Sequence, residues 1–166
     1  MFFSSYLRRA PLYKPFHVGV IGAGTCNKAI YDLAREIGYE IGKRGWILVC
    51  GGLGGVMEAA SKGCTEAGGM TVGLLPGLDM RSANPFIHIA IPTGLGEARN
   101  ALVVRASHVL VAVSGGYGTL SEIALGLKTG KKVVGLHTWS GIKGIQYAET
   151  PTEAIKLVEK ELISSR

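Results

Sequence analysis

Short apolar runs alternate with segments of helical periodicity along most of the chain, and this alternation is what most constrains its fold. Six apolar runs have the length of strands, at 16–21, 46–50, 70–76, 86–91, 108–113 and 131–136. Helical spacing or cap signals mark five further segments, at 28–44, 56–67, 94–107, 120–129 and 151–165. Repeated βα units with right-handed crossovers predict an α/β fold, namely a three-layer Rossmann-like sandwich with a mainly parallel, doubly wound sheet.

The strand-like runs also indicate how many domains there are and where a ligand would bind. HVLVAV and KKVVGL are apolar almost throughout, which is typical of parallel strands that helices cover on both faces. The 166 residues suffice for one core, so we expect an irregular N-terminal arm over 1–15 and a single Rossmann-like nucleotide-binding domain over 16–166. In such a sheet, ligands bind beyond the carboxyl ends of the strands.

Charge and cysteine content exclude several classes of function. The formal net charge is +6, but the basic residues are scattered, so no nucleic-acid partner is expected. No apolar run approaches the roughly 20 residues of a membrane span, so no membrane association is expected. Cys26, Cys50 and Cys64 lack the paired spacing of a metal site, which predicts free thiols, no metal and a cytoplasmic location.

Three predicted strands end in turns of small residues, GAGT at 22–25, GGLGG at 51–55 and GGYGT at 115–119. Glycine lets the main chain approach a ligand, and the start of a helix offers free N–H groups with positive partial charge. Together these features predict a site for a phosphorylated small molecule. The candidate binding residues are Gly22, Gly24, Thr25, Gly51, Gly52, Gly54, Gly55, Gly115, Gly116, Gly118 and Thr119.

The turns fit neither of the two common nucleotide motifs. GAGTCN lacks the third glycine of the dinucleotide fingerprint, and the second strand ends without the acidic residue that binds ribose, so NAD is disfavoured. GGYGT lacks the Lys-Ser/Thr pair of a P-loop, so hydrolysis of nucleoside triphosphates is disfavoured as well.

Arg99 and Glu122 are the candidate catalytic pair. Glu122 follows the third glycine turn, where a carboxylate can also serve as a helix cap. Arg99 belongs to the preceding helical segment, so both side chains can reach one pocket. A guanidinium and a carboxylate beside a phosphate site suit a phosphorylated sugar, since the carboxylate can stabilise oxocarbenium charge or activate water.

The motifs resemble those of a known superfamily over residues 18–136. GGYGTLSE is similar to the P-G-G-x-G-T-x-x-E motif of the LONELY GUY (LOG) proteins, long labelled "possible lysine decarboxylase". CGGLGGVME resembles their G-G-G-x-x-G-L-M-G turn, and Arg99 lies fifteen residues before Ser114, as the family's arginine precedes its P-G-G turn. The resemblance implies a Rossmann-like fold, a homodimer or higher homo-oligomer, and hydrolysis of the N-glycosidic bond of a nucleoside monophosphate. It assigns catalysis to Arg99 and Glu122, and phosphate binding to the third turn.

The chain departs from the LOG pattern at four positions. Ser114 replaces the proline, Asn100 replaces a lysine, Cys50 replaces the first glycine of the earlier motif, and Glu58 replaces its last. A carboxylate at Glu58 would repel phosphate or bind a sugar hydroxyl, so we include it among the ligand-binding residues and expect an altered substrate.

GGLGGVMEAASKG is similar, in addition, to the related molybdenum-cofactor carrier proteins, which bind a phosphorylated pterin without turning it over. Two hypotheses therefore remain, a binding or carrier protein and a nucleoside 5'-monophosphate phosphoribohydrolase. Neither requires a cofactor, and the bound molecule would be a nucleoside monophosphate or a phosphorylated pterin. Lysine decarboxylation is disfavoured because no residue stands out as the lysine that would bind pyridoxal phosphate.

Overall fold

The computed structural model describes residues 14–164. Most of the predicted N-terminal arm, residues 1–13, and the last two residues of the predicted domain lie outside this range. The described strands are β1 His17–Gly22, β2 Ile47–Cys50, β3 Met70–Leu75, β4 Ile89–Pro92, β5 Val109–Val113, β6 Lys132–Leu136 and β7 Ile145–Tyr147. The α-helices are α1 Lys28–Lys43, α2 Val56–Glu66, α3 Asn100–Ala106, α4 Tyr117–Lys128 and α5 Pro151–Ser164, and two short 3-10 turns are η1 Met80–Ser82 and η2 Gly96–Arg99.

All of the paired strands run parallel, in the order β4-β3-β2-β1-β5-β6-β7. From β1 the chain winds outward through β2, β3 and β4, and then crosses back to β5 on the other side of β1. The predicted doubly wound Rossmann-like sandwich is thereby confirmed. The order reverses between β1 and β5, and the crevice at such a reversal is where ligands bind in sheets of this type.

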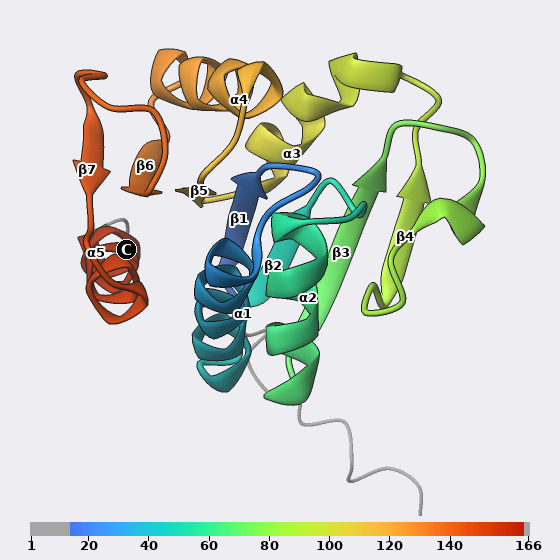
Figure 1. The fold of residues 1–166 in the computed structure, drawn as a ribbon, viewed down its shortest axis with the longest axis horizontal. Coiled ribbons are helices and arrows are strands. Elements are labelled where there is room, and N and C mark those ends of the chain that lie inside the picture. The colour runs from blue at the N-terminus through green and yellow to red at the C-terminus, as the bar shows by residue number, and fades with distance from the viewer. Residues whose placement is uncertain (1–13, 165–166) are drawn as a thin grey trace, which may run out of the picture.

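Helices cover both faces of the sheet (Figure 1). Side chains of α1, α2 and α5 form one apolar cluster with the sheet, and α3 and α4 contribute to a second. The inner strand β5, next to the central strand β1, is buried at every residue. On the first face α1 and α2 pack backbone to backbone, since a Cβ added at Gly38 would lie 1.9 Å from the Ala60 carbonyl oxygen.

Side-chain hydrogen bonds cap the starts of two helices. The Asn27 side chain caps α1 by accepting a hydrogen bond from the Ile30 N–H at 2.9 Å. The Thr150 hydroxyl likewise accepts from the Glu153 N–H at the start of α5, at 3.2 Å. Within the described chain, no helix has the length and apolarity needed to cross a membrane.

Four elements differ from the sequence prediction. Helix α4 begins at Tyr117 rather than at 120. The fourth strand begins at Ile89 rather than at 86, because residues 85–88 form a turn in which the Phe86 carbonyl accepts a hydrogen bond from the Thr71 hydroxyl. The expected helix over 94–107 is divided into η2 and α3, and it starts late because Gly94 and Gly96 have positive φ. Strand β7 was not predicted, since three residues at a sheet edge are too few to show a periodicity.

Candidate functional site

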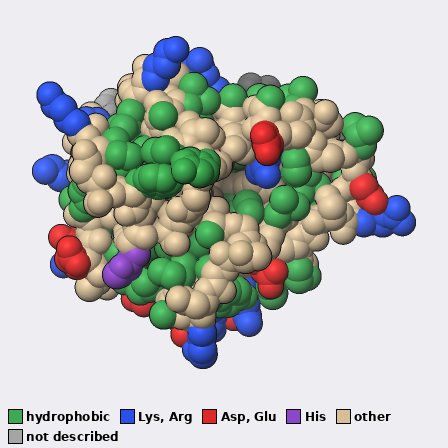
Figure 2. All heavy atoms as spheres, turned by 45° about the horizontal axis from the view of Figure 1, so that its top comes forward, with side chains coloured by type: hydrophobic (Ala, Val, Ile, Leu, Met, Phe, Trp, Pro, Cys, Tyr) green, Lys and Arg blue, Asp and Glu red, His purple; other side chains and the backbone are tan. Residues whose placement is uncertain are grey.

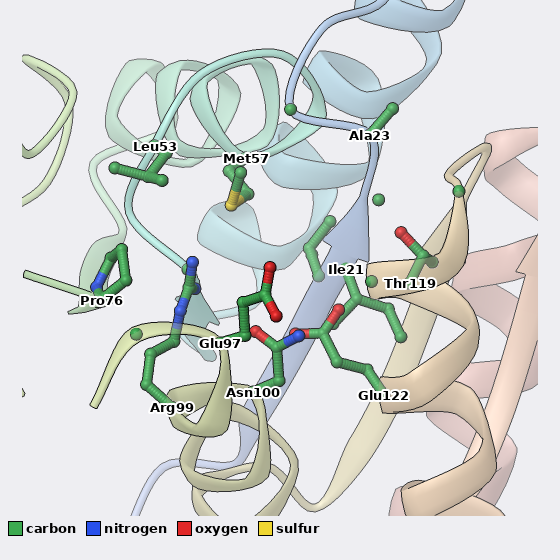
Figure 3. Close-up of a pocket in the computed structure, with 17 residues that line it drawn as sticks. Ile21, Ala23, Leu53, Met57, Pro76, Glu97, Arg99, Asn100, Thr119 and Glu122 are labelled. Atoms are coloured by element: carbon green, nitrogen blue, oxygen red, sulfur yellow. The ribbon is translucent and has the colours of Figure 1, made fainter.

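A cavity of about 370 Å³ lies at the carboxyl ends of β1, β2 and β5, where the strand order reverses (Figure 3). Its volume falls within the roughly 300–1,000 Å³ of typical small-molecule sites. In the space-filling view the molecule is hollowed near an acidic and a basic side chain, with hydrophobic side chains around them (Figure 2). The sheet therefore gathers the three glycine turns around one small-molecule-sized space.

The structure brings most of the predicted motif positions together, but not all of them. The predicted residues that line the cavity are Gly22, Gly24, Gly51, Arg99, Gly116, Gly118, Thr119 and Glu122. Those outside the lining are Thr25, Gly52, Gly54, Gly55, Glu58 and Gly115. Several of the second group shape the turns: Gly52, Gly55 and Gly115 have positive φ, which favours glycine.

Arg99 reaches the cavity from the end of η2 and is only 8% exposed. Its Nε is buried and has no hydrogen-bond partner among the described residues. Burial lowers the pKa of Arg99, an effect that the nearby charge of Glu122 opposes. The guanidinium is therefore a buried cation with an unpaired donor, a costly arrangement that a negatively charged ligand beside it would offset.

Gly51, at the end of β2, makes room for this guanidinium. A Cβ added there would lie 1.8 Å from Arg99 Nη1 and 2.7 Å from the Met57 sulfur, which are both flexible side-chain atoms. The first glycine of the second turn thus supports the position of Arg99, a coupling between two motifs that are far apart in the sequence.

We expect Gly51→Ala to displace the Arg99 guanidinium without unfolding the sheet, because only side-chain ends stand in the way of the new methyl group. Affinity for a phosphorylated ligand should fall roughly tenfold, the value of one charge-assisted hydrogen bond. Calorimetric titration measures this loss. Gly77→Ala is the control, since its Cβ would meet nothing within 4 Å. Unchanged affinity in Gly51→Ala would refute the coupling.

Glu122 lies on α4 and is 7% exposed. Its carboxylate makes no hydrogen bond to any residue that the structure describes. Burial raises the pKa of Glu122 to about 7, although the charge of Arg99 lowers it. At neutral pH the group is therefore present in both its acid and its carboxylate form. The alternative role as a helix cap is wrong, because Gly116 is the N-cap of α4 and Glu122 lies beyond the first turn.

The first turn of α4 faces the same cavity. Gly116 provides no side-chain cap, so the first N–H groups of the helix remain available to a ligand. A Cβ at Gly116 would meet nothing within 4 Å, and one at Gly118 would approach only the Asn100 amide, at 4.0 Å. Thr119 adds a hydroxyl that makes no hydrogen bond within the described chain. Open space, free donors and a helix dipole suit an anion.

The connection between β6 and β7 fixes this turn in place. Ser114 has a φ of 54° and donates its N–H to the Leu136 carbonyl at 3.1 Å. The Thr138 hydroxyl donates to the Ser114 carbonyl at 2.7 Å, and Trp139 Nε1 donates to the Gly116 carbonyl at 3.1 Å. A proline at 114 could neither adopt that φ nor donate that bond, so serine suits this backbone better than the residue of the motif that the turn resembles.

Glu58, expected to shape the substrate site, does not line the cavity. Its charge acts instead at the start of α1, where burial and then the Glu58 carboxylate raise the pKa of both Cys26 and Tyr31. Glu58 stands where the resembled motif ends in glycine, but its position on α2 brings it near the start of α1.

Sequence reasoning missed a carboxylate and an apolar wall. Glu97, two residues before Arg99, lines the cavity, as do the apolar side chains of Leu53, Met57 and Pro76. Glu97 lies in the same predicted helical segment as Arg99, 94–107, but nothing in its type or spacing separates it from a solvent-exposed charge. The three apolar side chains likewise carry no group whose type indicates a binding role.

Comparison with known proteins places the chain among relatives of two kinds. A family model described as the SLOG cluster4 family matches residues 15–164. An uncharacterized protein from Archaeoglobus fulgidus is 46% identical over 142 residues, which are 86% of this chain and 93% of that protein. The cytokinin riboside 5'-monophosphate phosphoribohydrolase LOG of Oryza sativa is 34% identical over 107 residues, 61% of this chain but only 44% of the rice protein.

Two solved structures match over nearly their whole length. The molybdenum cofactor binding protein from Rippkaea orientalis has a TM-score of 0.86 and 34% identity, and the match covers 90% of this chain and 99% of that one. The Moco carrier protein from Chlamydomonas reinhardtii has a TM-score of 0.84 and 38% identity, with 91% and 99% covered.

Proposed function

This chain belongs to the SLOG cluster4 family, and on that basis we propose that it binds a phosphorylated nucleotide or nucleotide-like cofactor at the carboxyl ends of its strands. The observation that carries the proposal is the buried, unpartnered guanidinium of Arg99 in a cavity that also receives the uncapped start of α4.

Electrostatics favour a negatively charged group close to Arg99 or to the start of α4, although the Glu97 carboxylate also lines the cavity. Arg99 is the one cation among the described lining residues, and the start of α4 adds the positive end of a helix dipole. Glu122 does not neutralise Arg99 fully, because burial raises the pKa of its carboxyl to about 7. A phosphate at the start of α4 would be held by backbone N–H groups and the Thr119 hydroxyl, within the field of the guanidinium.

Two classes of relatives support the proposal that a phosphorylated ligand binds here. One of the similar structures is a molybdenum cofactor binding protein and another a Moco carrier protein, which supports a phosphorylated pterin held without turnover. The rice relative acts on a riboside 5'-monophosphate, which supports a nucleoside monophosphate. A protein that binds the phosphorylated end of either molecule accounts for both, and it needs no further cofactor.

We test binding by thermal unfolding with AMP, GMP, CMP, UMP and pterin-6-ylmethyl phosphate. A ligand at 100 times its Kd adds about 2.7 kcal/mol, which raises the Tm of a domain of this size by roughly 5–10 °C. Ribose at the same concentration is the control and should leave the Tm unchanged. If no phosphorylated compound shifts the Tm, the proposal is wrong.

The second candidate function is nucleoside 5'-monophosphate phosphoribohydrolase, and the environment of Glu122 is the observation that favours it. A carboxyl group with a pKa of about 7 both takes and gives a proton at neutral pH. In hydrolysis the N-glycosidic bond breaks, water adds to the sugar carbon, and its proton passes to the base. Glu122 would accept that proton or stabilise the oxocarbenium charge, while Arg99 lies close enough to lower its pKa. Release of free base and ribose 5-phosphate distinguishes this function from that of a carrier.

A further inference from the structure

Glu97 is a charged side chain of the cavity that the proposed function leaves without a role. It lies on η2, it is exposed, and it forms no ion pair or hydrogen bond with another residue of the described chain. Figure 3 shows its carboxylate directed into the space between Arg99 and Ile21. A carboxylate in an anion-binding cavity opposes phosphate unless the ligand carries hydrogen-bond donors to meet it.

The cavity has two unlike sides. In Figure 3 Arg99 and Thr119 lie at opposite sides of the labelled group, and Leu53, Met57 and Pro76 lie on the Arg99 side. A phosphate at the start of α4 therefore leaves the rest of the ligand to extend toward the apolar wall. A flat ring suits that wall, since small-molecule sites combine apolar surfaces with a few polar groups that fix orientation.

Two of the polar groups that line the cavity are an acceptor and a donor. The Glu97 carboxylate accepts hydrogen bonds only, and the Arg99 guanidinium donates only. The two groups form no ion pair, so each remains available to a ligand. Their combination is complementary to a ring edge that presents N–H and amino donors beside a carbonyl oxygen.

We infer that Glu97, with Arg99 beside it, selects ligands that carry a 2-amino-4-oxo-pyrimidine edge, as guanine and pterin rings do. The inference rests on the proposed function, which supplies the phosphate end of the ligand. The two oxygens of Glu97 accept the ring N–H and the amino group, and Arg99 donates to the carbonyl. Adenine presents a ring nitrogen acceptor where this edge has its N–H, so a carboxylate disfavours it. Hypoxanthine keeps the N–H but lacks the amino group.

The test is a calorimetric titration of three nucleotides that share one ribose 5-phosphate, GMP, IMP and AMP. We expect the wild-type chain to bind GMP about tenfold more tightly than IMP or AMP, the value of one hydrogen bond to a charged group. A second comparison shows whether the preferred ring is a pterin rather than a guanine. Pterin-6-ylmethyl phosphate is compared with lumazine-6-ylmethyl phosphate, which has an oxo group in place of the amino group. Tighter binding of GMP than of IMP and AMP supports the inference and identifies a guanine ring. Tighter binding of the pterin than of the lumazine supports it and identifies a pterin ring.

Glu97→Gln should weaken binding of the preferred amino-bearing ligand about tenfold and change the affinity for its partner less than about threefold. Glu58→Gln is the matched control, because this carboxylate lies outside the cavity lining, and it should leave every affinity unchanged. If AMP binds as tightly as GMP and the two pteridines bind equally, the selection is overturned while the proposed function stands. The selection is also overturned if Glu97→Gln weakens the binding of every ligand by the same factor. If no phosphorylated compound binds, the proposed function itself fails.

Discussion

At pH 8 the Glu122→Gln variant is expected to be more stable than the wild-type chain by roughly 3 kcal/mol in its free energy of unfolding. Burial raises the pKa of this carboxyl from 4.5 to about 7. Between these values the folded chain holds a proton that the unfolded chain has released, so wild-type stability falls as the pH rises from about 5 to about 8. Glutamine does not titrate and keeps nearly the same shape.

Urea unfolding at a series of pH values measures this difference. The gain should be absent below about pH 4.5, where the carboxyl is protonated in both states, and complete by about pH 8. Glu36→Gln is the control, because that side chain is exposed and lies outside the cavity. A variant that is less stable than wild type at pH 8 would show that the carboxylate is better compensated in the fold than its surroundings indicate.

The same substitution decides between the two candidate functions. If the chain hydrolyses nucleoside monophosphates, Glu122→Gln should lower turnover by at least about 100-fold, because positioned proton transfer typically contributes 10²–10⁴-fold. Ligand binding would persist, and thermal protection can be measured alongside turnover. If the wild-type chain is protected by ligand but releases no ribose 5-phosphate, the carrier function stands and the hydrolase is excluded.

The second large effect is expected at Arg99. Arg99→Gln should weaken binding of a phosphorylated ligand roughly 100-fold, since breaking a buried charged contact costs about 2–5 kcal/mol. The substitution leaves the lining of the cavity with two carboxyl groups, Glu97 and Glu122, and no cation. The expected loss thus comes both from a missing donor and from carboxyl charge that no cation in the lining offsets.

Calorimetric titration of Arg99→Gln with the tightest-binding compound measures this loss. Arg105→Gln is the matched control, because Arg105 is on the adjoining helix α3 but is exposed and does not line the cavity. Affinity that falls equally in both variants would mean that only overall charge matters. Affinity that is unchanged in Arg99→Gln would contradict the proposed function of this guanidinium.

The architecture could be predicted from sequence because its signals are local. Apolar runs, glycine turns and the Thr150 cap each lie within a few residues of one another. Two of the elements that differ from the prediction depend on distant partners. The edge strand β7 exists through its pairing with β6, and the start of β4 is set by Thr71, fifteen residues before Phe86. The expectations of a homo-oligomer and a cytoplasmic location stay predictions.

About half of the residues that line the cavity could be predicted from the sequence in the same way. Arg99, Glu122 and the turn at 116–119 follow from the order of strands and glycines, because the carboxyl ends of parallel strands share one edge of the sheet. The sequence does not show which of Glu97 and Glu58 lines the cavity. Their positions on η2 and α2 decide that Glu97 does and Glu58 does not.

The sequence by itself determined the doubly wound sheet, the edge at which a ligand would bind and the chemical types available there, since periodicity and turn chemistry are properties of neighbouring residues. Only the tertiary structure decided that Gly51 makes room for Arg99, that Glu122 is buried enough to hold a proton near pH 7, and that Glu97 rather than Glu58 faces the ligand space. These outcomes depend on burial and close approach between segments distant in the chain. The pattern of residues along the sequence shows neither burial nor contact between distant segments.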